Sequence, residues 1–145
     1  MRSIDFKGHQ AGDRVMALIL VVDDELTILD VISTILESEN HEVVTELDSQ
    51  KAKDLMVERH FDLLLSDIRM KPVNGMQLLR HAHENCPWMT VILLTAFGQV
   101  ETAVEAMELG AFDYLAKPFR SQQLIDVVAK AVAARSLDST SKPGE

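Results

Sequence analysis

Short apolar runs alternate with amphipathic stretches along most of the chain. Five runs have the length of strands: residues 17–22 (ALILVV), 42–47 (EVVTEL), 61–66 (FDLLLS), 90–95 (TVILLT) and 111–116 (AFDYLA). The first and the fourth are apolar at successive positions, which is typical of strands buried on both faces. This pattern predicts a parallel sheet that is covered on both sides.

Between these runs the apolar residues follow a helical spacing. The clearest stripe is formed by Leu26, Leu29, Ile32, Ile35 and Leu36, and four later stretches show shorter repeats. Those repeats are Leu55 with Met56, Met76 with Leu79, Val100 with Val104 and Met107, and Leu124 with Val127, Val128 and Ala131. The sequence therefore predicts five strand–helix units joined by short connections.

Alternating strands and helices imply an α/β fold. For five strands we predict a doubly wound, flavodoxin-like (βα)5 fold whose parallel strands have the order 2-1-3-4-5. Ligands of such sheets bind outside the carboxyl ends of the strands, where the winding direction reverses. In this chain that point lies between the first and third strands.

The length of 145 residues is that of a single domain. We expect this domain to span residues 17–135, after an N-terminal extension of residues 1–16 and before a flexible tail or linker of residues 136–145. The longest apolar run is too short to cross a membrane, and residues 1–15 lack the apolar stretch of a secretory signal.

The charge and the cysteine content of the chain bear on nucleic-acid binding and on the location of the protein. The formal net charge is −9, with 14 basic residues scattered among 23 acidic ones. Because nucleic-acid-binding domains usually carry a clustered basic face, we expect no direct nucleic-acid contact by this domain. The single cysteine, Cys86, cannot form an internal disulfide, which is typical of a cytoplasmic protein.

Polar side chains follow the predicted strands at one edge of the sheet. Asp23 and Asp24 come after the first strand, Asp67 follows the third, Thr95 ends the fourth and Lys117 follows the fifth. Three clustered carboxylates repel one another and need a cation. An all-oxygen ligand set favours a hard ion, and we predict Mg²⁺.

The charges of this cluster are compatible with phosphoryl chemistry at Asp67. Mg²⁺ and Lys117 would bring the three aspartates close to neutrality. A phosphoryl group on Asp67 would add negative charge, which the same two cations could stabilise. The carboxylate of Asp67 is a competent nucleophile, and the product would be an acyl phosphate.

Each of these residues also has a simpler interpretation when it is taken alone. Asp23 or Asp24 could cap the helix that starts near Glu25. Asp67 could be a turn residue, Thr95 an ordinary β-branched residue at a strand end, and Lys117 a surface lysine. Their combination favours the metal site.

The segments VVDDE, LLSDIRM, LLTAF and YLAKPF resemble the signature segments of bacterial response regulator receiver domains, and the resemblance extends over roughly residues 18–134. It implies that Asp67 is the phosphoacceptor. It also implies that Asp24, Asp67 and the backbone carbonyl of Arg69 ligate Mg²⁺. Asp23 would either ligate the ion or orient a water bound to it.

The resemblance also implies a switch. Thr95 would be the switch hydroxyl and Tyr114 the switch aromatic, while Lys117 would contact the phosphoryl group and precede a cis bond to Pro118.

The chain departs from the family pattern in one loop. The family usually has proline four residues after the acceptor, whereas this chain has Lys71 there and Pro72 next, with Gly75 in its usual place. The shape of this loop is therefore left open.

The function implied by the resemblance is that of a phosphorylation-dependent signalling receiver in a phosphorelay. The donor would be a sensor histidine kinase or a histidine phosphotransfer protein. A homodimer through the fourth helix, the fifth strand and the fifth helix is a further expected interaction. The protein would assist its own phosphorylation and dephosphorylation without being a conventional enzyme.

Two alternatives belong to other classes. The first is a pseudo-receiver, an interaction module that is never phosphorylated, although it would not need the aspartate cluster. The second is a haloacid-dehalogenase-like phosphatase, which places its nucleophile after the first strand in a DxD arrangement. Here the two aspartates at that place are adjacent.

Overall fold

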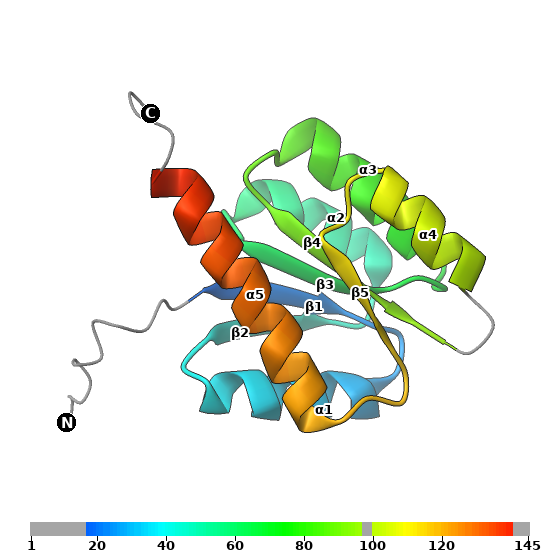
Figure 1. Ribbon diagram of the computed structural model, residues 1–145. Helices are drawn as coiled ribbons and strands as arrows, with labels where there is room; N and C mark the ends of the chain where they lie inside the picture. The colour runs from blue at the N-terminus through cyan, green and yellow to red at the C-terminus, as the bar shows by residue number, and fades with distance from the viewer. Residues whose placement is uncertain (1–16, 97–99, 141–145) are drawn as a thin grey trace.

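The computed structural model describes residues 17–96 and 100–140, and strands and helices alternate throughout this part of the chain (Figure 1). The strands are β1 (Leu18–Val22), β2 (Glu42–Glu46), β3 (Leu63–Asp67), β4 (Thr90–Thr95) and β5 (Asp113–Ala116). The helices are α1 (Leu26–Ser38), α2 (Ser49–Glu58), α3 (Gly75–Asn85), α4 (Val100–Glu108) and α5 (Ser121–Thr140). The predicted order of elements is confirmed.

The sheet has five parallel strands in the order β2-β1-β3-β4-β5. The predicted doubly wound α/β fold is therefore correct. The two central neighbours β1 and β3 are in register from Ile19 with Leu63 to Val22 with Ser66. This register brings the residues that follow β1 next to the carboxyl end of β3.

Strand β1 shows how the two faces of the sheet are covered. Ile19 and Val21 belong to one core cluster, whereas Leu20 and Val22 belong to the other. All four side chains are fully buried, because successive residues of a strand point to opposite faces. Figure 1 shows α1 and α5 on one face and α2, α3 and α4 on the other. Each such burial contributes roughly 1.5–3 kcal/mol to folding.

Helix α4 forms where the sequence predicts a helix, but its apolar stripe does not face the core. Val100, Val104 and Met107 are 66%, 50% and 39% exposed. The buried positions are Ala103 and Ala106, whose small side chains let the helix lie close to the sheet. The repeat of apolar residues therefore predicted the helix correctly but did not predict which of its faces is buried.

Helix α5 is longer than the sequence predicted. It continues to Thr140, whereas the flexible tail was expected to begin at Ser136. The preceding segment AVAAR is rich in alanine, the strongest helix former, and Arg135 forms an ion pair with Asp62. Asp62 in turn accepts a hydrogen bond from the backbone N–H of Leu18 at 2.9 Å, so this end of the helix is held at the amino edge of the sheet.

The expected N-terminal extension of residues 1–16 and the last part of the expected tail, residues 141–145, lie outside the described residues. Within the described ranges, no helix combines the length and the apolarity that a membrane span requires.

Candidate functional site

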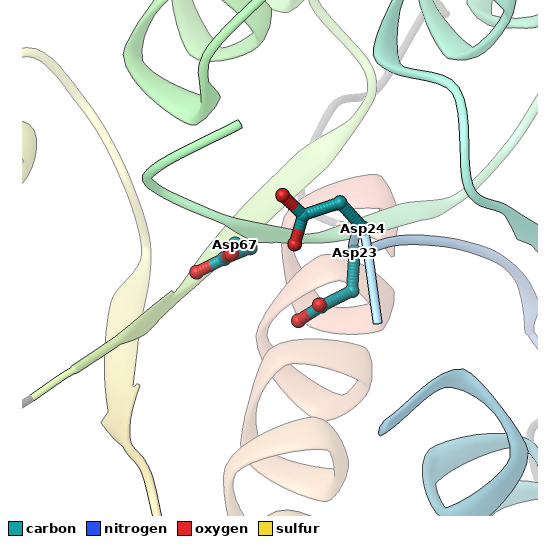
Figure 2. Close-up of side chains that lie close together, drawn as sticks. All are labelled: Asp23, Asp24 and Asp67. Atoms are coloured by element: carbon teal, nitrogen blue, oxygen red, sulfur yellow. The ribbon is translucent and has the colours of Figure 1, made fainter. Parts of the chain in front are cut away.

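Three aspartates converge at the carboxyl edge of the sheet, between β1 and β3. Asp23 and Asp24 directly follow β1, and Asp67 is the last residue of β3. Carboxylate oxygens of all three lie within 4.8 Å of one another (Figure 2). The switch-point rule predicted this convergence, and the structure confirms it. The donor set consists of oxygens alone, which fits a hard divalent cation such as Mg²⁺.

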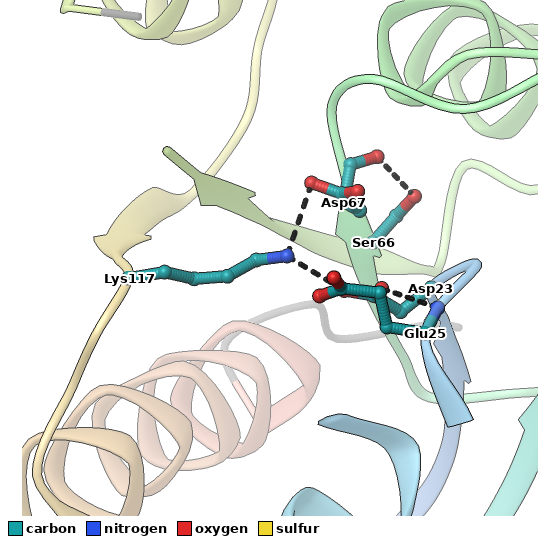
Figure 3. A network of polar contacts seen from close by, with 5 residues as sticks. All are labelled: Asp23, Glu25, Ser66, Asp67 and Lys117. Atoms are coloured by element: carbon teal, nitrogen blue, oxygen red, sulfur yellow. Dashed lines mark hydrogen bonds and ion pairs between the residues drawn. The ribbon is translucent and has the colours of Figure 1, made fainter. Parts of the chain in front are cut away.

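Lys117 reaches the same cluster from the segment after β5. Its ammonium donates a hydrogen bond to Asp23 Oδ2 at 2.9 Å and lies 3.5 Å from Asp67 Oδ1 (Figure 3). The Asp23 side chain is fully buried and that of Lys117 is 17% exposed. The bond between Lys117 and Pro118 is cis, as the resemblance implied. The interpretation of Lys117 as a free surface lysine is therefore wrong.

Burial and neighbouring charges shift the pKa values of Asp67 and Lys117. Burial is the largest influence on Asp67 and, with the charges of Asp23 and Asp24, raises the pKa of its carboxyl even though Lys117 opposes this. Burial alone would lower the pKa of the Lys117 ammonium. The hydrogen bond to Asp23 and the charges of Asp23 and Asp67 outweigh burial, so that pKa is raised. The site thus holds a protonated lysine and a carboxylate that lacks full charge compensation.

The capping interpretation of the first two aspartates is not supported. The N-cap of α1 is Glu25, and no side chain caps that helix. Asp23 Oδ1 instead accepts a hydrogen bond from the backbone N–H of Glu25 at 2.9 Å. Because Oδ2 of the same carboxylate accepts from Lys117, Asp23 is oriented by both neighbours.

Sequence reasoning missed Ser66. This fully buried residue precedes Asp67 and donates its hydroxyl hydrogen bond to the Asp67 carbonyl at 2.9 Å (Figure 3). A hydroxyl in the otherwise aliphatic run LLLSD was the available signal. Ser66 thereby satisfies a backbone acceptor at the end of β3.

The remaining predicted residues occupy different environments. Thr95 ends β4 and is 4% exposed, and its carbonyl accepts a hydrogen bond from the Lys117 N–H at 2.7 Å. Arg69 is exposed in the loop after β3. Tyr114 pairs with Leu93 in the sheet and is 39% exposed, so its ring is not enclosed by the core.

The loop after β3 has a defined shape, which the sequence left open. The bond between Lys71 and Pro72 is cis, and Asn74 caps α3 in a reciprocal pair of hydrogen bonds with Gln77. Gly75 begins that helix next to the acceptor strand. A Cβ atom at this position would lie 2.3 Å from the Asp67 carbonyl oxygen, so only glycine fits.

We expect Gly75→Ala to lower the free energy of unfolding by about 1–3 kcal/mol, because the added methyl group would push on backbone rather than on a flexible side chain. It should also weaken Mg²⁺ binding, since it displaces the backbone of Asp67. Asn74→Ala is the control: it loses the cap, at a cost of about 1 kcal/mol, without approaching Asp67. Urea unfolding and calorimetric Mg²⁺ titration measure both effects. An unchanged Mg²⁺ affinity in Gly75→Ala would show that the backbone position next to Gly75 does not influence Mg²⁺ binding.

The sequence matches the family model described as the response regulator receiver domain over residues 19–129. The alginate biosynthesis transcriptional regulatory protein AlgB of Pseudomonas aeruginosa is 40% identical over 119 residues, which are 82% of this chain and 26% of AlgB. A receiver domain protein from Clostridium thermocellum has a TM-score of 0.79 at 37% identity, covering 83% of this chain and 98% of that one. NtrX from Brucella abortus has a TM-score of 0.83 at 34% identity, covering 87% of this chain and 29% of NtrX.

The chain belongs to the response regulator receiver family. Its function is therefore that of a phosphorylation-dependent receiver in two-component signalling, a class that takes its signal from histidine kinases. Receiver domains generally bind Mg²⁺, which agrees with the acidic cluster. The family match also sets aside the phosphatase alternative. The chain spans about a quarter of the length of the curated relative AlgB.

Proposed function

We propose that Asp67 is the residue that accepts the phosphoryl group, from phosphohistidine of a sensor kinase or of a phosphotransfer protein. A carboxylate oxygen of Asp67 would form the new bond to phosphorus as the bond from phosphorus to the histidine nitrogen breaks. The convergence of Asp67 with Asp23, Asp24 and Lys117 carries this proposal. Asp67 is 7% exposed at the rim of the sheet. Most of the side chain is shielded from solvent, and the exposed part would be open to a phosphoryl donor.

Mg²⁺ fits this site, and we propose that Asp24, Asp67 and the Arg69 carbonyl hold it, with Asp23 ligating the ion or orienting a water. When bound, the ion would neutralise charge on the phosphoryl oxygens. Lys117 already lies within 3.5 Å of Asp67 Oδ1, and it would contribute the second positive charge. In this way the chain would assist its own phosphorylation and dephosphorylation without acting as a conventional enzyme.

We further propose that Thr95 and Tyr114 convert phosphorylation into a change of surface. The Thr95 hydroxyl would turn toward a phosphoryl oxygen, and the ring of Tyr114 would rotate into the space released. A population shift of about 1–3 kcal/mol between two states would suffice. The 39% exposure of Tyr114 supports this, because its ring is not yet enclosed by the core.

The surface that this switch would alter is formed by α4, β5 and α5, and we propose that a homodimer forms there. Exposed apolar side chains on it support the proposal: Val100, Val104 and Met107 of α4 and Tyr114 of β5. Such side chains are typical of the buried core of an interface.

We propose that this domain itself does not contact nucleic acid, because its net charge is −9. If the protein regulates DNA, that activity would lie outside this domain. A cytoplasmic location is proposed as well, in keeping with one free, buried cysteine, Cys86.

The direct test is incubation with acetyl phosphate, followed by intact-mass analysis. We expect a single phosphoryl adduct that forms in Mg²⁺ and is absent in EDTA, with a calorimetric Mg²⁺ titration that shows one site. A pseudo-receiver would give neither adduct nor Mg²⁺ binding, and that outcome would replace the proposed function by the interaction-module alternative.

A further inference from the structure

A pocket of about 570 Å³ lies beside the acidic cluster, between the loop after β3 and helix α4. Ile68, Met70 and Met76 provide apolar lining, and Thr102 contributes from α4. Pockets of roughly 300–1,000 Å³ with apolar walls and a few polar groups are typical of sites for small organic molecules. Methionine side chains adapt to ligands of different shape.

The charged residues of the lining indicate the class of ligand. Arg69 and Lys71 both line the pocket and are both exposed. In the described part of the chain, no ion pair engages either of them. Asp24 is the one acidic residue of the lining, and its carboxylate belongs to the metal cluster. Two cationic side chains are therefore free to bind an anion.

We propose that this pocket binds a small organic anion with an apolar body. The body would pack on Ile68, Met70 and Met76, and a carboxylate or sulfonate group would pair with Arg69 and Lys71. An inorganic anion would leave the apolar lining without contacts, and a neutral hydrocarbon would leave both cations unpaired. The binding does not depend on Asp67 being the phosphoacceptor.

The location gives the pocket a means to influence signalling. Its lining shares Asp24 and Arg69 with the proposed Mg²⁺ site, and Thr102 belongs to the helix whose exposed face is the proposed dimer surface. A bound anion would contact the loop after β3 and helix α4 at the same time.

The test uses the amphipathic probe 1-anilinonaphthalene-8-sulfonate, titrated in Mg²⁺ buffer into the full chain with ¹³C-methyl methionine. We expect saturable chemical shift changes at Met70 and Met76. Met56 and Met89 are the internal controls, because they are buried in the same core cluster without lining the pocket. Changes at the exposed Met107 of α4 alone, or at no methionine, would overturn the proposal.

Matched variants test each half of the site by fluorescence titration. Thr102→Trp fills the pocket and should weaken binding at least about tenfold, whereas Glu101→Trp adds the same side chain to the same helix outside the lining. Equal affinity of these two variants would overturn the proposal. This comparison tests the volume of the pocket.

Removal of the cations tests the charge. Arg69→Gln combined with Lys71→Gln should weaken sulfonate binding roughly fivefold, the effect expected of exposed ion pairs. Binding of the neutral analogue N-phenyl-1-naphthylamine should be unchanged. The control removes two other exposed cations, by Lys51→Gln with Arg80→Gln, and should bind the sulfonate as the parent chain does. An equal loss in both double variants would contradict the assignment.

Asp67→Asn protein should still show saturable chemical shift changes at Met70 and Met76, because Asp67 does not line the pocket. A failed phosphorylation assay would therefore leave this binding test intact, and a failed binding test would leave the proposed acceptor intact.

Discussion

Asp67→Asn protein is expected to form the phosphoryl adduct with acetyl phosphate and Mg²⁺ about a thousandfold more slowly than the parent chain does. The amide has no negative oxygen with which to attack phosphorus, and neither neighbouring aspartate lies at the end of β3. Intact-mass analysis over time measures the rate. An adduct that still formed at the parent rate would show that another residue accepts the group.

The same substitution is expected to stabilise the metal-free protein. Because burial raises the folded-state pKa of Asp67 above its unfolded value, folding favours the protonated carboxyl. This contribution is present at low pH and is lost as the pH rises through the raised pKa. In EDTA the parent chain should therefore lose stability over that window, and Asp67→Asn should lose less.

Urea unfolding in EDTA at mildly acidic and at neutral pH measures this difference. The control is Asp30→Asn, which removes the same charge from an exposed position on α1. If Asp30→Asn changes the pH dependence as much as Asp67→Asn does, the effect is one of net charge and not of the site.

The strand order and the site were predictable for the same reason. The runs that became β1 and β4 are apolar at successive positions, and this pattern has few structural solutions besides a covered parallel sheet. In that sheet the carboxyl ends of neighbouring strands meet at one edge, so Asp24 and Asp67 had to come close together.

Features that depend on tertiary packing were not predictable. The Asp23 and Asp24 side chains are adjacent in sequence, yet one is buried and the other exposed. The partner of Asp23 is Lys117, 94 residues away, and no local pattern specifies which of two carboxylates a distant lysine reaches. Likewise the repeat in α4 did not reveal that Val100 and Val104 face outward, because burial depends on which helix face the sheet contacts.

Lys117→Met protein is expected to be destabilised by about 3 kcal/mol in EDTA. The substitution keeps most of the apolar volume but leaves the fully buried carboxylate of Asp23 without its cation. It also removes the positive charge that lies 3.5 Å from Asp67 Oδ1. The control, Lys130→Met, removes the same charge from an exposed position on α5 and should leave stability nearly unchanged.

Mg²⁺ should partly restore the stability that Lys117→Met loses. Such a recovery distinguishes an electrostatic effect from a packing defect. Without Lys117 the three carboxylates lack a fixed counter-charge, so a divalent cation should bind more tightly than it does to the parent chain. Calorimetric titration should show a lower Kd for Lys117→Met, and urea unfolding should show a larger stabilisation by Mg²⁺. If Mg²⁺ bound both proteins equally, the lysine would not be compensating the charge of the cluster. Its proposed role as the second cation at the phosphoryl site would then lose its electrostatic basis.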